Sequence, residues 1–171
     1  RMSRGLGDVY KRQQYANTFT DAAKGKTIAA AMYASGVDVI FQAAGATGNG
    51  VFAEAKAENQ ATTADKKVWV VGVDMDQKAD GNYTTKDSEK SNFTLASAIK
   101  RVDNAVVLVA NQGKKGNFPG GKTVTYGLKE KGVDIARDSM PDNAWQAAQK
   151  AKQQILAGKI SVPTDPTKVK Q

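Results

Sequence analysis

Two carboxylates that directly follow a hydrophobic run, Asp74 and Asp76, are the residues of this chain best placed to bind a ligand. They end the segment 68–77, whose β-branched and aromatic residues are typical of a buried strand in a parallel sheet. In open α/β sheets, ligands bind just beyond the carboxyl ends of such strands. A carboxylate there accepts charge-assisted hydrogen bonds from hydroxyl groups or holds a cation. The alternative is a strand followed by an Asx turn or a helix cap, so a sugar-like ligand, a metal and a structural role all stay open.

Three other features offer binding chemistry, each with a plainer alternative. The glycine turn Gly45–Gly50 is expected between a strand and a helix, where its N–H groups would face a phosphate or a hydroxyl, although tight packing explains the glycines equally well. It has neither the lysine of a P-loop nor the dinucleotide spacing. Lys100, expected in the first turns of a helix, either reaches a cleft or is solvated. Phe19, in a polar surround, either stacks on a planar ligand or folds into the core.

The elements that must position these residues follow from hydrophobic periodicity, glycines and caps. Helices are expected at residues 22–35, 51–58, 97–111 and 142–157, strands at 37–42, 68–73, 124–128, 133–136 and 160–162, and a long exposed loop at 77–92. This alternation predicts an α/β fold with a doubly wound, mainly parallel sheet. Right-handed crossovers then bring the segments after Phe19, Gln42 and Val73 to one edge of the sheet.

Composition excludes several kinds of chemistry. The 171 residues suffice for one domain with a core, and they include no cysteine and no histidine, which rules out disulfides, thiol catalysis, histidine triads and the usual zinc sites. The net charge of +8 comes from 25 basic and 17 acidic residues scattered along the chain, which favours a solvated basic surface over a nucleic-acid site. No run of 18 apolar residues is present, so the sequence predicts no membrane-spanning helix.

The first thirteen residues do not continue the pattern of the rest. They have no helix or strand period, and they resemble a translated sequencing-adapter tract of the kind found at the ends of metagenomic fragments. A genuine basic arm is the alternative. We expect residues 1–13 to be non-native and residues 14–171 to be the C-terminal part of a longer protein.

Five motifs, in order along the chain, resemble the BMP (basic membrane protein) family of substrate-binding lipoproteins of ABC importers, in particular its purine nucleoside receptors. The motifs are Asn17–Lys26, Val39–Val51, Trp69–Gln77, Ala96–Asp103 and Gly158–Pro163. Each motif alone is weak, whereas five in order are specific. Ala96-Ser97 is a small departure, because the family usually has Thr-Ser there.

The resemblance implies one lobe of a type I periplasmic-binding-protein fold, in which a hinge closes two lobes around the ligand. This chain looks like the C-terminal lobe, with the N-terminal lobe missing. The resemblance also implies that Phe19 stacks on the base, that Gly45 lies at the pocket wall, and that Asp74 and Lys100 bind the ribose hydroxyls. Asp74 and Lys100 are able to pair when the site is empty, and Asp76 is expected to be a structural or turn residue.

The implied function is that of an extracytoplasmic substrate-binding component of an ABC importer, which delivers a nucleoside, in particular a purine nucleoside, to a membrane permease. Such a protein is not an enzyme, needs no cofactor or metal, binds no nucleic acid, and is held at the membrane by a lipid anchor outside this chain. One alternative is a Mg²⁺-dependent phosphoryl or nucleotide-sugar enzyme that uses Asp74 and Asp76. A second and weaker alternative is a regulatory sensor on the same fold. The lack of further acidic or phosphate-binding lysine motifs near Asp74 favours binding.

Overall fold

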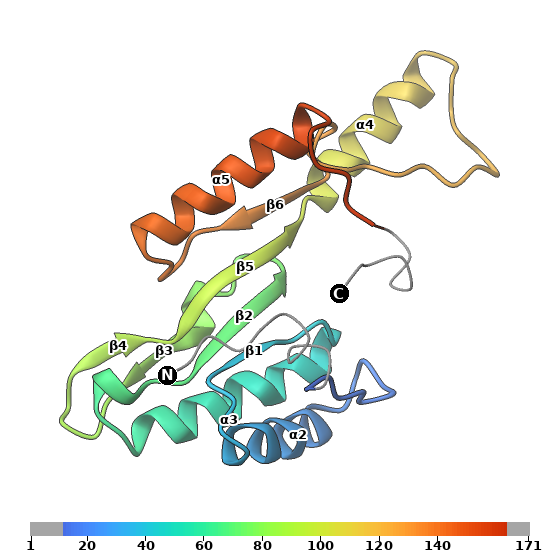
Figure 1. Ribbon diagram of the computed structural model, residues 1–171. Helices are drawn as coiled ribbons and strands as arrows, with labels where there is room; N and C mark the ends of the chain where they lie inside the picture. Colours follow the sequence, from blue (N-terminus) through green and yellow to red (C-terminus); the bar gives the residue numbers. More distant parts are fainter. Residues whose placement is uncertain (1–11, 164–171) are drawn as a thin grey trace.

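A four-stranded sheet positions the candidate residues in the computed structural model, which describes residues 12–163 (Figure 1). Its strands lie in the order β1 (Val39–Phe41), β2 (Trp69–Asp74), β5 (Thr94–Lys100) and β6 (Val133–Ala136). The helices are α2 (Ala22–Ala34), α3 (Gly48–Gln60), α4 (Val102–Lys114) and α5 (Asp142–Leu156), with 3-10 turns η1 (Gly45–Thr47), η2 (Ala64–Lys66) and η3 (Lys78–Gly81). The predicted α/β class with a mainly parallel sheet is confirmed.

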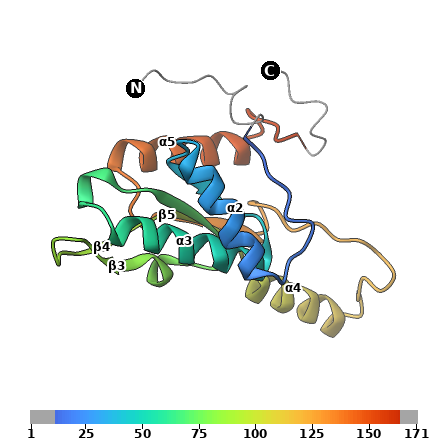
Figure 2. The same cartoon turned by 90° about the horizontal axis from the view of Figure 1, so that it is seen from below.

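Strand direction determines which residues meet at the edge of the sheet. β1 pairs with β2, and β2 with β5, in parallel, whereas β6 runs antiparallel to β5. Strand β5 lies between α3 and α5 in both views of the ribbon (Figures 1 and 2). In the register of β2 and β5, Asp74 is opposite Ile99, next to Lys100. The carboxyl ends of β1, β2 and β5 therefore form one edge, as the βαβ pattern predicts.

The hydrophobic core is centred on Phe93, which is completely buried just before β5. Its ring contacts Phe52 of α3 and Tyr83, with ring centroids 5.9 and 5.6 Å away. Val70 of β2 and Ile40 of β1 complete the layer between the sheet and the helices. Burial of one such aromatic or aliphatic side chain contributes about 1.5–3 kcal/mol. This core therefore packs α3 against the face of the sheet formed by β1, β2 and β5.

Helices α2 and α3 approach each other through glycines. A Cβ built on Gly50 would lie only 1.9 Å from the backbone oxygen of Ala22, and one on Gly25 would lie 2.0 Å from the backbone oxygen of Thr47. These distances leave no room for any side chain, because the neighbouring atoms belong to backbone. The glycine turn thus has a packing role, and its second half, from Gly48 onward, is the first turn of α3.

The helix expected at residues 97–111 is wrong in its first part. Residues Thr94–Lys100 form strand β5, and the helix begins only at Val102. Ala96, Ser97 and Ala98 suit a helix by local propensity, but here they lie in the middle of the sheet, with Ala96 and Ser97 buried. Pairing with β2 and β6 overrides propensity, which is a weak local preference. Lys100 is consequently the last residue of a strand and does not lie on a helix.

Other expectations for the elements had mixed outcomes. The helices near 22–35, 51–58 and 142–157 and the strands near 37–42, 68–73 and 133–136 are confirmed, with shifted ends. Residues 77–92 are not simply an exposed loop, because they contain η3 and the hairpin of β3 (Asn82–Thr84) and β4 (Lys90–Asn92), and Gln77 and Tyr83 are buried. Residues 124–128 and 160–162 form no strand.

Helix α4 points away from the sheet (Figure 1). None of its residues is buried, and Val102 and Val106, two apolar residues four positions apart, are more than 60% exposed. The part of the chain that the structure describes therefore leaves these two side chains largely uncovered. None of the described helices combines the length and the apolar content that crossing a lipid bilayer requires.

Candidate functional site

Asp74 and Lys100 form an ion pair at the carboxyl edge of the sheet. Each is the last residue of its strand, and the two strands are neighbours, so the Lys100 Nζ lies 2.7 Å from an Asp74 carboxylate oxygen. The side chains are 48% and 70% exposed for Asp74 and Lys100 respectively. A pair so open to water contributes under about 1 kcal/mol to stability. Both charged groups are therefore accessible from solvent, and the expected pairing of Asp74 with Lys100 is present.

The backbone of Asp74 is strained. Its φ is +71°, and the Met75 N–H donates to the Val73 carbonyl oxygen at 2.8 Å, which closes a three-residue γ-turn around Asp74. A γ-turn with positive φ at its central residue is rare and unfavourable. Such strain persists only where surrounding interactions hold it, and it is concentrated at functional sites. The turn ends β2 abruptly and leaves the Asp74 carboxylate beside Lys100.

Phe19 and Gly45 form a second pair of candidate residues. The Thr47 N–H donates to the Phe19 carbonyl oxygen at 3.2 Å, and a Cβ built on Gly45 would lie 3.2 Å from that same oxygen. Gly45 has a φ of +56°, which an ordinary residue adopts only with strain. The Phe19 side chain is 69% exposed, so the alternative in which it folds into the core is wrong.

A chain of buried and partly buried polar groups connects the strand ends near this edge with the middle of β5. Gln42, directly after β1, donates from Nε2 to Gln77 Oε1 at 2.8 Å, and the same oxygen accepts from the Val73 N–H at 2.9 Å. The Gln77 N–H donates to Ser97 Oγ at 3.1 Å, and Ser97 donates to an Asp138 carboxylate oxygen at 2.8 Å. The ends of β1, β2 and β6 and the middle of β5 are thereby tied together.

This polar chain does not follow from the sequence as a unit. Gln42, Gln77 and Ser97 all lie within the motifs that the resemblance rests on, but their partners are distant in sequence. The local pattern shows only that Gln42 is a polar residue at the end of a hydrophobic run, and it does not show that this side chain is buried. That signal is the same for any strand end, so the hydrogen-bond partners could not be inferred.

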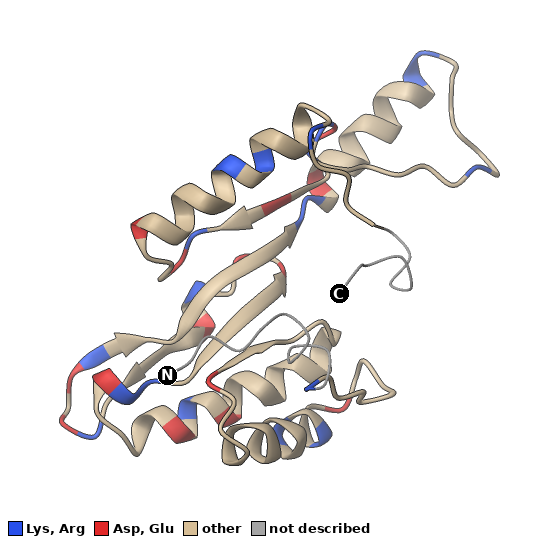
Figure 3. Cartoon of the chain, in the orientation of Figure 1, with Lys and Arg blue, Asp and Glu red and all other residues tan. Residues whose placement is uncertain are grey.

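Asp76 has a structural environment, as the resemblance implies. Its carboxylate accepts from the Lys78 N–H at 2.9 Å, which is an Asx turn into η3. Within residues 12–163, no three acidic residues are grouped so that they could hold a metal ion. Charged residues are spread over the whole ribbon, in agreement with the expected scattered surface charge (Figure 3).

The pKa of the Asp138 carboxyl is raised above its ordinary value. Burial is the largest cause, and the nearby negative charge of Asp76 adds to it, while the hydrogen bond from Ser97 and the positive charge of Lys78 act in the opposite direction. A carboxyl whose pKa is higher in the folded state binds its proton more tightly after folding. Its contribution to stability is complete below about pH 4 and is lost as the pH rises through the folded-state pKa.

We therefore expect Asp138→Asn to raise the melting temperature at pH 7 by roughly 2 °C. Asparagine accepts the same hydrogen bond from Ser97, removes the repulsion from Asp76, and tolerates the φ of +44° at this position. Thermal melts at pH 7 and pH 4 test this, with exposed Asp87→Asn as the control for loss of one charge. The gain should vanish at pH 4, and an equal gain at both pH values would contradict the assignment to ionisation.

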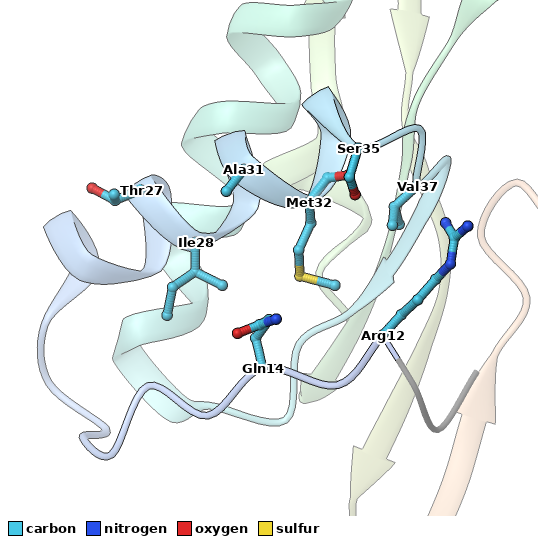
Figure 4. Close-up of a pocket in the computed structure, with 8 residues that line it drawn as sticks. All are labelled: Arg12, Gln14, Thr27, Ile28, Ala31, Met32, Ser35 and Val37. Atoms are coloured by element: carbon cyan, nitrogen blue, oxygen red, sulfur yellow. The ribbon is translucent and has the colours of Figure 1, made fainter. Parts of the chain in front are cut away.

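A hollow elsewhere on the surface does not involve the candidate site residues. It lies between α2 and the segment that precedes it, and Figure 4 shows its lining side chains. Ile28, Met32 and Val37 make it largely apolar, with Arg12 and Gln14 at its border. None of Phe19, Gly45, Asp74 and Lys100 lines it. The hollow is therefore separate from the candidate site at the sheet edge.

Comparison with known proteins connects this geometry to a family. Residues 8–166 match the family model of PnrA-like ABC transporter substrate-binding proteins (Bmp). The chain belongs to this family. The Bmp relatives include the ABC transporter nucleoside-binding protein BmpA of Lactococcus lactis subsp. cremoris (strain MG1363), 54% identical over 92% of the chain and 45% of that protein. The CD4+ T-cell-stimulating antigen of Listeria monocytogenes serovar 1/2a is 48% identical over 90% of the chain and 43% of that protein.

The solved structures that resemble this Bmp chain support the fold. A solute-binding protein of an ABC transporter system from Aeropyrum pernix K1 superposes with a TM-score of 0.66 at 24% identity, over 90% of this chain and 48% of that one. A transcriptional activator of the comK gene from Bacillus halodurans reaches 0.69 at 21% identity, over 86% of this chain and 46% of that one. The chain spans about half the length of the curated relatives it matches.

Proposed function

We propose that this chain is the C-terminal lobe of an extracytoplasmic substrate-binding protein that binds a nucleoside, in particular a purine nucleoside, for an ABC importer. The observation that carries the proposal is the Asp74–Lys100 pair, open to solvent at the sheet edge of a Bmp-family chain. The similarity to the nucleoside-binding protein BmpA of Lactococcus lactis supports the choice of ligand.

The pair suits the two adjacent hydroxyls of a ribose. A carboxylate has two acceptor oxygens, so Asp74 can accept from both hydroxyls, while the Lys100 ammonium donates to either. Charge-assisted bonds of this kind are the stronger ones. Because the two charges already neutralise each other at 2.7 Å, the site offers hydrogen-bonding capacity without net charge, which fits a neutral sugar better than a phosphate.

The second pair suits the base. Phe19 presents a ring that is 69% exposed, which leaves a face for stacking on a planar heterocycle. Gly45 carries no side chain, which leaves room for Phe19, whose carbonyl oxygen would lie 3.2 Å from a Cβ there, and in this proposal Gly45 forms the pocket wall beside the ring. Gln42 and Gln77 connect the loop that leads to Gly45 with the turn of Asp74, so both pairs belong to one edge of the sheet.

The remaining parts of the proposal concern what lies outside the chain. A site at the edge of one lobe is half a pocket, and clefts between lobes are common ligand sites. In this proposal a second lobe covers the edge, hinge closure buries the nucleoside, a lipid anchor holds the protein at the membrane, and a permease receives the ligand. No residue has to act as a catalytic base or nucleophile.

The test is calorimetric titration of the full-length gene product with inosine, guanosine, adenosine, cytidine and free ribose. We expect purine nucleosides to bind with a Kd of about 1 µM or below, and ribose to bind at least about 100-fold more weakly because it lacks the stacked base. The affinity should be the same with and without Mg²⁺. Absence of heat with every nucleoside would contradict the proposal that the ligand is a nucleoside. Mg²⁺-dependent turnover would support the phosphoryl-transfer alternative instead.

A further inference from the structure

Gln77 is a buried residue whose side chain forms a hydrogen bond with the residue directly before Asp74, at the start of the strained turn. Its side chain is 8% exposed, and its Oε1 accepts from the Val73 N–H at 2.9 Å, on the residue directly before Asp74. The same oxygen accepts from Gln42 Nε2, and the Gln77 Nε2 donates to an Asp80 carboxylate oxygen at 3.1 Å. The side chain therefore uses both its acceptor and its donor group, and its partners lie in β2, after β1 and in η3.

The surrounding residues fix this amide in place. A Cβ built on Gly72 would lie 2.9 Å from both Gln77 Oε1 and Ser97 Oγ, so the strand passes directly over the Gln77 side chain only because it carries glycine there. The Gln77 N–H donates to Ser97, and its carbonyl oxygen accepts from Thr94 Oγ1 at 3.1 Å. Backbone and side chain of Gln77 are thus held from β2 and β5 together.

We infer that Gln77 is a positioning residue, which holds the γ-turn of Asp74 in its strained form and so keeps the carboxylate aligned for the ligand. A turn with positive φ at a non-glycine residue relaxes unless neighbouring interactions prevent it. The Val73 N–H bond to Gln77 is the interaction that anchors the turn at the residue before Asp74, and the bond from Gln42 couples it to the loop that carries Gly45. The ligand named in the test rests on the proposed function.

The test compares Gln77→Met, which keeps the length of the side chain and removes its hydrogen bonds, with the control Gln60→Met at an exposed position near the end of α3. Binding of inosine and of 2′,3′-dideoxyinosine to the full-length protein is measured by calorimetry. We expect Gln77→Met to weaken inosine binding about 30-fold and to change dideoxyinosine binding by less than about 2-fold, since only inosine has the hydroxyls that Asp74 binds. Equal loss for both ligands, or no loss, would overturn the inference.

Rescue and a ligand-independent measurement complete the test. Gln77→Glu combined with Asp80→Asn reverses the hydrogen bond between these two residues and keeps an oxygen for Val73 and Gln42, so inosine affinity should return to within about 5-fold of the parent protein. Amide hydrogen exchange at Met75 reports the γ-turn bond directly and should be at least about 10-fold faster in Gln77→Met. If the parent protein binds no nucleoside, the proposed function fails, whereas unchanged exchange at Met75 makes the positioning role fail.

Discussion

Asp74→Asn in the full-length protein is expected to weaken purine nucleoside binding by about 100-fold, close to 3 kcal/mol. Asparagine has nearly the same shape, and it tolerates the φ of +71° that the γ-turn requires. It removes the negative charge, however, so it offers the ribose hydroxyls one neutral acceptor and leaves Lys100 without its partner at 2.7 Å. The loss should therefore lie in binding and not in folding. Calorimetric titration together with a thermal melt of the same sample measures both.

Asp76→Asn is the matched control for this experiment. Asp76 lies two residues from Asp74 and has the same side chain, but its carboxylate accepts from the Lys78 N–H, a bond that asparagine can also make. We expect its nucleoside affinity to stay within about 3-fold of the parent value. Equal losses in the two variants would mean that general charge at this edge matters and that Asp74 has no specific role. An unchanged affinity in Asp74→Asn would remove Asp74 from the site.

Gly50→Ala is expected to destabilise the fold by about 3 kcal/mol or more. The added methyl group would lie 1.9 Å from the Ala22 carbonyl oxygen and 2.5 Å from the Lys26 backbone nitrogen, so α2 and α3 must separate to accept it. Overpacking of this kind costs about 1–3 kcal/mol even where side chains can yield, and here the clash is with backbone. Chemical denaturation of the parent protein and the variant gives the difference in the free energy of unfolding.

Gly113→Ala provides the control for glycine replacement within a helix. Gly113 also lies in a helix, near the end of α4, but the nearest atom to a new Cβ is 3.6 Å away on Phe118. Because alanine has the higher helix propensity, this variant should be unchanged or more stable by up to about 1 kcal/mol. A Gly50→Ala protein as stable as the parent would show that the contact between α2 and α3 is looser than the structure indicates.

The sequence predicted well those features that depend on local patterns. Val70 and its neighbours in β2 are a hydrophobic run of the right length, and Asp74 follows the last residue of that run, so strand and candidate ligand group were both found. The pairing of Asp74 with Lys100 was expected as well and is present. That expectation came from the resemblance to a family, because the two residues are far apart in sequence.

Two of the expectations that are wrong, a helix at residues 97–100 and an exposed Gln77, have a common physical cause. The sequence predicts that residues 97–100 begin a helix, because Ile99, Val102 and Val106 have helical spacing, yet these four residues belong to strand β5, which lies between β2 and β6. Only the positions of β2 and β6 decide this, and those positions are non-local information. The sequence likewise predicts Gln77 at the start of an exposed loop, because its partners Gln42, Val73 and Ser97 come from three different segments and leave no local signal.

The antiparallel pair at the end of the sheet has an architectural consequence. Lys100 is opposite Val133 in the register, and the Arg101 N–H donates to the Gly132 carbonyl oxygen at 2.9 Å, so residues 101–132 leave and rejoin the sheet at a single point. β5 and β6 are thus a hairpin in which a helix and a long connection replace the turn. The entropy of closing such a loop grows only logarithmically with its length. Residues 101–132 can accordingly change in length or packing during evolution while the strand that ends in Lys100 keeps its place.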